Sequence, residues 1–246
     1  MSAPLRIAMW SGPRNISTAM MRAFENRDDT AVVDEPFYAA YLAQTGLDHP
    51  MRDDVLKSQP TDWRDVAAML LGPAPGGAAV FYQKHMTHHM LPEFGIDWMA
   101  ACRNVFLIRR PDEVVASYRE RRGEIALADI GVVRQAELFD REAGRLGHAP
   151  LVIDSSDVSA APAPMLQALC AAVGLVFSDK MLAWPKGKRA SDGVWAPAWY
   201  DQVEQSTGFV AKARSAPPDL PPALAAIADA AYPHYERLAR WKITAA

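Results

Sequence analysis

Apolar residues occur along this chain in short runs of four to six residues, and each run is followed by polar or turn-forming residues. Such runs, rich in valine, isoleucine and aromatic residues, are typical of β-strands. The central runs are almost continuously apolar, as expected for strands covered on both faces of a parallel sheet. The predicted strands are Leu5 to Trp10, Thr30 to Asp34, Ala78 to Gln83, Asn104 to Arg109 and Leu151 to Asp154.

Between these runs, apolar residues recur at intervals of three and four, which indicates helices with one buried face. In the last such segment, Leu224, Ile227, Ala231 and Leu238 fall on one side. Strands that alternate with helices predict an α/β fold with a five-stranded parallel sheet and helices on both faces. The predicted helices are Ile16 to Asn26, Trp63 to Leu71, Pro111 to Arg122, Gly131 to Leu146, Pro164 to Val173 and Pro222 to Ala239.

The length of 246 residues, half of them apolar, suits one domain that spans residues 1–246. Two turn-rich connectors, Gly72 to Gly77 and Ala213 to Pro222, are too short to require a second domain. We therefore expect a single core.

The net charge of −3 provides no overall basic field, so binding to nucleic acid is not expected. No apolar run approaches the roughly 20 residues that cross a bilayer, so no membrane association is expected either. Cys102 and Cys170 are the only cysteines, and they form neither a disulfide framework nor a zinc-ligand spacing. These features favour a cytoplasmic protein.

The first candidate site is the segment Ser11 to Thr18, which connects the first predicted strand directly to a helix. A tight loop before a helix N-terminus directs backbone N–H groups and the positive end of the helix dipole at one point, which favours an anion. Arg14 adds a forked cation, and the Ser17 and Thr18 hydroxyls can cap the helix or donate to a ligand. A capped turn without a ligand is the alternative.

The loop lacks the second glycine and the lysine of the nucleotide-binding pattern G-x-x-x-x-G-K-[ST]. It resembles instead the 5′-phosphosulfate loop of sulfotransferases, commonly written P-[RK]-[ST]-G-[ST]-[ST]. The matching segment is Pro13, Arg14, Asn15, Ile16, Ser17 and Thr18. Ile16 stands where the family usually has Gly, and a β-branched residue disfavours positive φ. The resemblance implies a P-loop NTPase-like fold, with 3′-phosphoadenosine 5′-phosphosulfate as co-substrate and no metal.

A second resemblance lies at the end of the fourth predicted strand. Sulfotransferases bind the 3′-phosphate of the co-substrate with an Arg at a strand end and a Ser eight residues later, and Arg109 and Ser117 have that separation. Pro111 favours a helix start, which places Ser117 two turns along. The alternative is that Arg109 forms a surface ion pair and that Ser117 has no contact with a ligand.

The family also has a basic loop that closes over the nucleotide near the C-terminus. The resembling segment here contains Lys186, Lys188 and Arg189, which the resemblance implies as further 3′-phosphate ligands. A solvated charged surface is the alternative. Trp195 and Trp199 follow, and each could stack on the adenine or pack in the core.

The chain further resembles a narrower group of sulfotransferase-like P-loop proteins, one of which is fused to an aminotransferase-like domain in plants. The segments that carry this resemblance are WSGPRNISTAMM (10–21), DEPFYAAYL (34–42), QKHM (83–86), DGVWAPAWY (192–200) and STGF (206–209).

Transfer of a sulfuryl group to a hydroxyl or amine requires a group that takes the acceptor's proton. Glu35 follows the second predicted strand, at the edge where ligands of open α/β folds bind. His85 follows the third predicted strand, as does a His in cytosolic small-molecule sulfotransferases. Either residue can be the base, and the neighbouring Lys84 can stabilise the oxygen between phosphate and sulfate. Structural roles in a helix cap or in the core are the alternatives.

His85, His88 and His89 have helical spacing, which leaves a metal site as a further alternative. For the whole chain, the resemblance favours a sulfotransferase-like enzyme acting on a small-molecule acceptor. An ATP-dependent small-molecule kinase on the same fold and a non-catalytic module that binds a phosphorylated metabolite are the rival hypotheses. The acceptor and the oligomeric state are left open.

Overall fold

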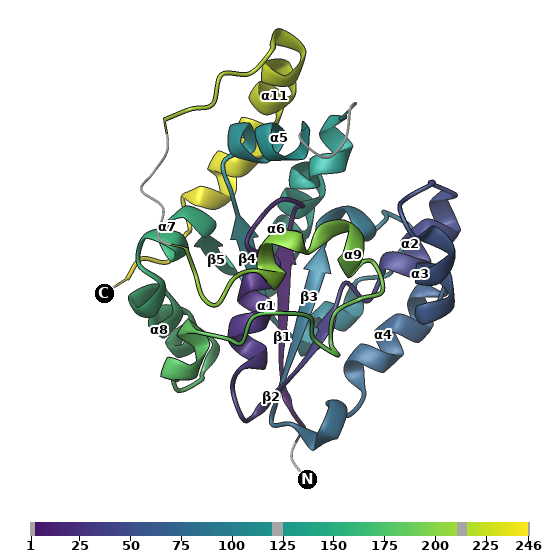
Figure 1. Cartoon of the computed structure of the whole chain (residues 1–246), viewed down its shortest axis with the longest axis vertical. Coiled ribbons are helices and arrows are strands. Elements are labelled where there is room, and N and C mark those ends of the chain that lie inside the picture. The colour runs from purple at the N-terminus through teal and green to yellow at the C-terminus, as the bar shows by residue number, and fades with distance from the viewer. Residues whose placement is uncertain (1–2, 120–124, 211–215, 246) are drawn as a thin grey trace.

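A computed structural model of the chain describes residues 3–119, 125–210 and 216–245. Five strands form one sheet in the order β2-β3-β1-β4-β5, and every pair is parallel. Figure 1 shows the strands side by side in the middle of the molecule. The strands are β1 (Leu5–Ser11), β2 (Thr30–Asp34), β3 (Val80–Met86), β4 (Arg103–Ile108) and β5 (Leu151–Asp154). The predicted five-stranded parallel sheet is confirmed.

Three predicted strand ends are wrong: β1 ends one residue later, at Ser11, and the ends of β3 and β4 matter for the site. β3 continues to Met86 because its last residues pair with β1, where Trp10 lies opposite His85 and Ser11 opposite Met86. His85 is therefore inside the strand and does not follow it. β4 ends at Ile108, so Arg109 lies just beyond its carboxyl end.

The sheet separates two apolar cores, because successive strand residues point to opposite faces. On one face, Ile7 and Met9 of β1 pack with residues of α1 and α8. On the other face, Ala8 and Trp10 pack with residues of α4, α6 and α11. Helices thus cover both faces of the sheet, as the sequence predicted.

The helices are α1 (Ser17–Glu25), α2 (Tyr38–Thr45), α3 (Arg52–Ser58), α4 (Trp63–Leu71), α5 (Pro111–Arg119), α6 (Val132–Leu146), α7 (Ser155–Ala160), α8 (Pro162–Val173), α9 (Ala196–Trp199), α10 (Asp201–Glu204) and α11 (Pro222–Ala239), with short 3-10 turns at Pro75–Gly77, Thr87–His89, Asp97–Ala101, Leu127–Ile130 and Asp179–Leu182. The helices α2, α3, α7, α9 and α10, all of eight residues or fewer, were not predicted. Residues 120–122 of the helix predicted to end at Arg122 lie outside the described residues.

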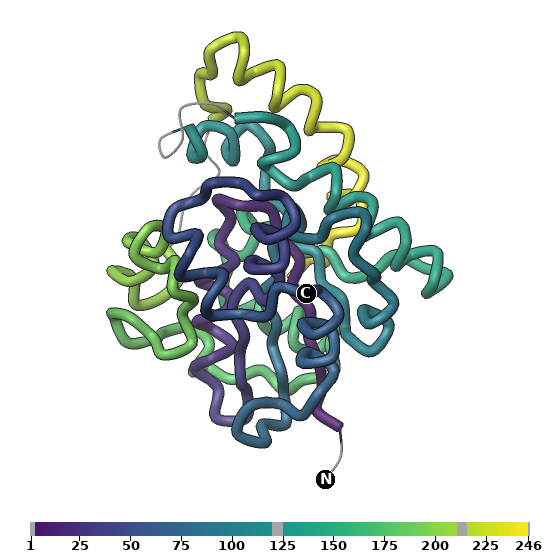
Figure 2. The backbone as a smooth tube through the Cα atoms, turned by 90° about the vertical axis from the view of Figure 1, so that its right-hand side faces the viewer, coloured from purple at the N-terminus to yellow at the C-terminus, as the bar shows by residue number. Residues whose placement is uncertain are grey.

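The last helix, α11, packs on α5 and α6. Figures 1 and 2 show it, in yellow, along the upper part of the molecule. Among the described residues, no helix combines the length and the apolar character needed to cross a bilayer.

Candidate active site

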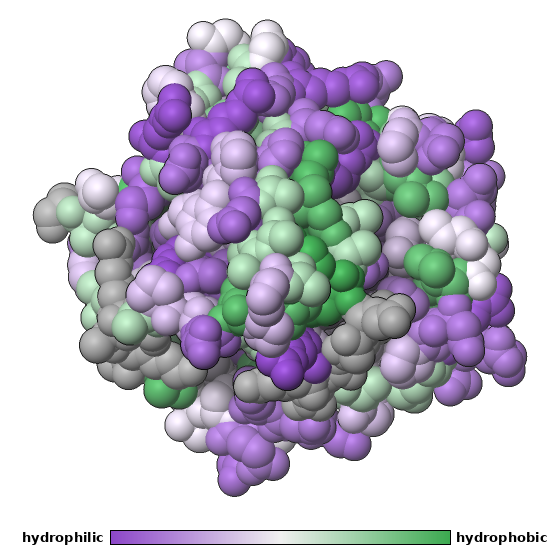
Figure 3. All heavy atoms as spheres, turned by 90° about the horizontal axis from the view of Figure 1, so that it is seen from above, coloured by the Kyte–Doolittle hydropathy of each residue, from purple (hydrophilic) through white to green (hydrophobic). Residues whose placement is uncertain are grey.

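A cavity of about 610 Å³ lies at the carboxyl edge of the sheet, where open α/β folds bind ligands. Seen from that edge, the molecular surface carries an apolar strip bordered by hydrophilic residues (Figure 3). The sequence-predicted residues that line the cavity are Pro13, Arg14, Asn15, Ile16, Ser17, Thr18, Glu35, Lys84, Arg109 and Ser117.

The loop between β1 and α1 forms one wall of the cavity, and its backbone turns at Arg14. Arg14 has a φ of 54°, in the left-handed region that few residues other than glycine adopt. Ile16, which replaces the family's usual glycine, has a φ of −81° and stands at the N-cap of α1. The residue with a positive φ in this loop is therefore Arg14, two residues before Ile16, and Ile16 fits without backbone strain.

Asn15 fixes this loop to the sheet. Its side-chain Nδ2 donates to the carbonyl of Leu107 in β4 at 3.1 Å, and its Oδ1 accepts from the Ile16 N–H at 2.9 Å. Helix α1 then begins at Ser17, and the first N–H groups of a helix have no acceptor within it. The positive end of the α1 helix dipole therefore lies at the cavity.

Side chains from two distant parts of the chain meet at this loop. Arg14 Nε donates to Ser117 Oγ at 3.0 Å, across 103 residues of sequence. Arg109 Nη1 donates to the backbone carbonyl of Arg14 at 2.5 Å, and Arg109 Nε pairs with Glu113 Oε2 at 3.0 Å. Two guanidinium groups, one hydroxyl and a helix N-terminus thus surround one region, which suits a ligand with phosphate or sulfate groups.

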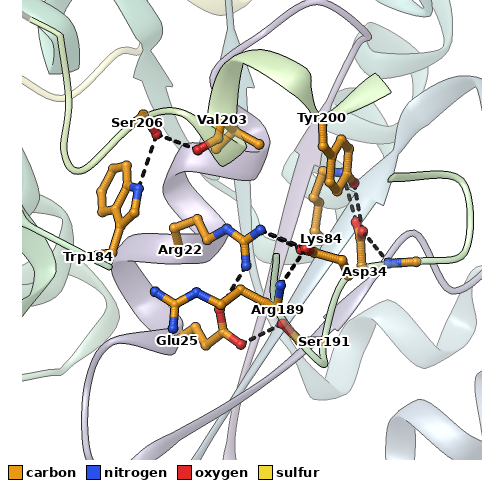
Figure 4. Close-up of polar contacts among 12 residues, drawn as sticks. Arg22, Glu25, Asp34, Lys84, Trp184, Arg189, Ser191, Tyr200, Val203 and Ser206 are labelled. Atoms are coloured by element: carbon orange, nitrogen blue, oxygen red, sulfur yellow. Dashed lines mark hydrogen bonds and ion pairs between the residues drawn. The ribbon is translucent and has the colours of Figure 1, made fainter. Parts of the chain in front are cut away.

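Elsewhere in the cavity wall, three buried polar side chains and the partly buried Glu35 form a closed network. Lys84 Nζ donates to Asp34 Oδ1 at 2.8 Å, to Glu35 Oε1 at 2.6 Å and to the Tyr200 hydroxyl at 2.6 Å. The Tyr200 hydroxyl donates to Asp34 Oδ2 at 2.6 Å. Figure 4 shows Lys84, Asp34 and Tyr200 converging from β3, β2 and the end of α9. All three ammonium hydrogens of Lys84 have acceptors.

The charges of this network shift its protonation equilibria. Burial alone would lower the pKa of Lys84, but Asp34, Glu35 and Tyr200 raise it well above the usual value. Burial raises the pKa of the Glu35 carboxyl, and the Lys84 ammonium opposes part of that rise. Glu35 also has a left-handed φ of 40°. Non-glycine residues with such backbone strain cluster at functional sites.

The structure does not bring His85 to the cavity. Lys84 points toward the α1 face, so its neighbour His85 points to the opposite face, where it stacks on Trp10 at 4.4 Å. Burial lowers the pKa of His85 to about 3. The prediction that His85 follows the strand as a candidate base is therefore corrected: the imidazole lies in the apolar core between the sheet, Phe37 and Trp98.

His88 and His89 do line the cavity, beyond the end of β3. Within residues 3–119, 125–210 and 216–245, no group of three or more His, Cys, Asp or Glu side chains is arranged to hold a metal ion. His85, His88 and His89 do not form the common helical face that the sequence spacing allowed, because His85 is in a strand.

The basic loop is also placed differently from the sequence expectation. Lys186, Lys188 and Arg189 are not among the cavity-lining residues. The loop lies along α1 instead: the Arg189 N–H and the side chain of Arg22 in α1 both bind the Asp192 carboxylate (Figure 4). Contacts with α1 therefore fix this loop away from the cavity.

The two tryptophans lie in different surroundings. Trp195 is buried in the core with Tyr38, and its Nε1 lies 3.3 Å from the Tyr200 hydroxyl. Trp199 is half-buried and lines the cavity.

Sequence reasoning missed Asp34, Tyr200 and His89 as parts of the site. The first two lie in the DEPFYAAYL and DGVWAPAWY segments, but nothing local shows that these segments meet around Lys84. Such a contact spans 166 residues, and only the folded chain reveals it.

A family model described as a sulfotransferase domain matches residues 5–240. Two relatives from Arabidopsis thaliana, named branched-chain-amino-acid aminotransferase-like proteins 1 and 2, are 34% identical over 209 residues and 32% identical over 203 residues. The alignments cover 85% and 82% of this chain but 37% and 36% of the relatives. The chain thus spans little more than a third of their length, and these plant proteins confirm the expected resemblance to a fused group.

Solved structures show the same likeness of fold. The sulfotransferase domain from the curacin biosynthetic pathway has a TM-score of 0.57 at 17% identity, covering 94% of this chain and 98% of that chain. A sulfotransferase from Alicyclobacillus acidocaldarius has a TM-score of 0.59 at 13% identity, covering 99% and 98%. The expected sulfotransferase-like P-loop fold is confirmed.

Proposed function

Since the chain belongs to the sulfotransferase domain family, we propose that it transfers a sulfuryl group from 3′-phosphoadenosine 5′-phosphosulfate to a hydroxyl or amine of a small acceptor. One observation carries the proposal. Arg14 contacts both Arg109 and Ser117, which lie about 100 residues further along the chain, and all three line the same cavity as the carboxylate of Glu35.

In this proposal the loop from Pro13 to Thr18 binds the 5′-phosphosulfate, and Arg109 and Ser117 bind the 3′-phosphate. Arg109 uses Nε and Nη1 in its contacts with Glu113 and Arg14, and a guanidinium has five N–H donors. Further donors of Arg109 therefore serve a phosphate while the existing contacts keep the side chain in place.

Glu35 is the general base that we propose, because it lines the cavity and His85 does not. Its carboxylate accepts the acceptor's proton as the acceptor atom bonds to sulfur. The bond between sulfur and the bridging oxygen breaks, and adenosine 3′,5′-bisphosphate leaves with that oxygen. The cations of the loop stabilise the negative charge that the leaving phosphate gains.

The role that we propose for Lys84 differs from the one predicted from sequence, which was to stabilise the oxygen between phosphate and sulfate. Its three donors are occupied by Asp34, Glu35 and Tyr200, so contact with the bridging oxygen would cost one of these bonds. We propose that Lys84 is a positioning residue, which orients Glu35 and favours its ionised form.

The donor assignment is tested by ligand-induced stabilisation. We expect adenosine 3′,5′-bisphosphate at about 1,000 times its Kd to stabilise the protein by about 4 kcal/mol, and ATP with magnesium to stabilise it less. Thermal unfolding with each nucleotide measures this difference. A larger shift with ATP, or no shift with either compound, would contradict the assignment and favour the kinase or the non-catalytic rival.

The base is tested with Glu35→Gln, assayed by the release of adenosine 3′,5′-bisphosphate from the co-substrate with a panel of alcohols and amines. We expect turnover to fall by about 10²–10⁴-fold while nucleotide binding is retained. Glu137→Gln, at an exposed position on α6, is the control. Full turnover in Glu35→Gln would show that another group takes the proton.

A further inference from the structure

The imidazole of His89 is held rigidly beside Glu35. It is stacked between Tyr38, with ring centroids 4.4 Å apart, and Tyr41, with centroids 4.9 Å apart. The residue is only 2% exposed, yet it lines the cavity. Two aromatic neighbours on its faces leave the ring little freedom to rotate, so the direction of its nitrogens is fixed.

His89 Nδ1 is buried and has no hydrogen-bond partner among the described residues. It lies 3.9 Å from Glu35 Oε2, while the other oxygen of this carboxylate binds Lys84. A separation of 3.9 Å is too long for a hydrogen bond, but one oxygen atom can lie about 2.8 Å from both atoms. A buried polar atom without a partner is costly, which favours a ligand atom at this point.

The chemistry of the pair selects what that ligand atom can be. Burial keeps the pKa of His89 well below its usual value. Charge on nearby His88, His49, Lys84 and His85 would lower this pKa further, so the ring is neutral. An ionised carboxylate only accepts hydrogen bonds, so the tautomer with the proton on Nδ1 is favoured beside Glu35. The two atoms thus offer one donor and one acceptor.

We propose that His89 Nδ1 and Glu35 Oε2 together bind a single hydroxyl oxygen of the acceptor, which makes alcohols and phenols the substrate class of this site. A hydroxyl donates to the carboxylate and accepts from the imidazole N–H, whereas a protonated amine has no lone pair for that N–H. The proposal rests on the function proposed above, in which Glu35 takes the acceptor's proton.

The wall of the cavity around this pair agrees with an uncharged acceptor. Tyr38, which stacks on His89, lines it together with Met86 and Trp199, and none of these three side chains is charged. An acceptor with an apolar or aromatic body would therefore lose little hydration when it binds, because it carries no charge of its own.

The kinetic test compares 2-phenylethanol with 2-phenylethylamine, which share one carbon skeleton. We expect the wild-type kcat/KM to be at least tenfold higher for the alcohol. His89→Phe, which keeps an aromatic ring between the tyrosines, should lose at least tenfold in kcat/KM for the alcohol, and His89→Gln, which retains an N–H donor, should lose less. Preference for the amine, or an equal loss for both acceptors, would overturn the proposal.

A second measurement does not depend on turnover. The ¹⁵N NMR spectrum of protein labelled at histidine, with adenosine 3′,5′-bisphosphate bound, should show His89 protonated on Nδ1 and shifted by 2-phenylethanol but not by ethylbenzene. His89→Phe identifies the signal, and the exposed His148→Phe is the control variant. A ring protonated on Nε2 alone overturns the proposal. An Nδ1 proton that responds to the alcohol, without any sulfuryl transfer, would uphold the subsite and reject the enzyme function.

Discussion

Arg109 donates a hydrogen bond from Nη1 to the backbone carbonyl of Arg14 at a distance of 2.5 Å. Arg14 is the residue at which the loop before α1 adopts its left-handed backbone, a conformation that costs on the order of 1–3 kcal/mol in a residue other than glycine. The guanidinium of Arg109 therefore supports the shape of the loop and also adds positive charge to the cavity that the loop lines.

We predict that Arg109→Ala weakens the binding of adenosine 3′,5′-bisphosphate by at least tenfold. A charge-assisted hydrogen bond to phosphate contributes about 1.5–3 kcal/mol, and only the 3′-phosphorylated ligand can lose it. Binding of adenosine 5′-monophosphate should weaken by a few-fold, because the loop also loses its support. Isothermal titration calorimetry with the two nucleotides measures the difference.

The neighbouring residue provides a matched control for Arg109. Arg110 contacts Asp112 and does not line the cavity, so Arg110→Ala should change either affinity by less than about twofold. Equal losses for the two nucleotides in Arg109→Ala would show that the residue acts on the loop alone.

Ile16→Gly should not improve nucleotide binding, although it restores the residue that the sulfotransferase pattern has at this position. The positive φ of this loop falls at Arg14, and Ile16 packs its side chain against the α1 core. We expect the glycine to lower the free energy of unfolding by about 1–3 kcal/mol through lost burial and added backbone entropy. Urea denaturation and titration calorimetry test this, and a tenfold gain in affinity would contradict it.

Tyr200→Phe should lower the free energy of unfolding by about 1–3 kcal/mol. The change leaves buried Lys84 and Asp34 each without one hydrogen-bond partner. Tyr82→Phe is the matched control, because its buried hydroxyl has no partner among the described residues, so its loss should be neutral or stabilising. Urea denaturation of both variants measures the difference. A similar change in the free energy of unfolding in the two variants would show that the hydrogen bonds of Tyr200 to Lys84 and Asp34 do not stabilise the protein.

His85 should make the protein sensitive to acid. Burial lowers the pKa of His85 in the folded protein to about 3, from about 6.5 in the unfolded chain, so its contribution to stability is complete above pH 6.5 and is lost as the pH falls toward 3. In this range the free energy of unfolding falls by about 1.4 kcal/mol for each pH unit, which is about 2 kcal/mol between pH 6.5 and 5. In His85→Phe, the free energy of unfolding should no longer show this part of the dependence on pH. Urea denaturation at several pH values measures it. An unchanged slope would show that the imidazole is protonated without unfolding.

Local sequence patterns predicted the order of the five strands and of the six longer helices, and the position of the loop before α1. These features follow from local patterns: alternating apolar runs, helical periodicity and the spacing of Arg109 and Ser117 before and within α5. Whether a residue lies near a strand end can be predicted in this way, because strand and helix signals extend over only a few neighbouring residues.

Packing between distant segments sets which side chains face the cavity. Lys84 and His85 are adjacent, and pairing with β1 extends β3 through both, so the pleat directs Lys84 toward the cavity and His85 into the opposite core. Likewise, contacts with α1 keep Arg189 away from the cavity, while Tyr200 reaches Asp34 across 166 residues. Such choices depend on packing between distant segments, and no local pattern contains that information.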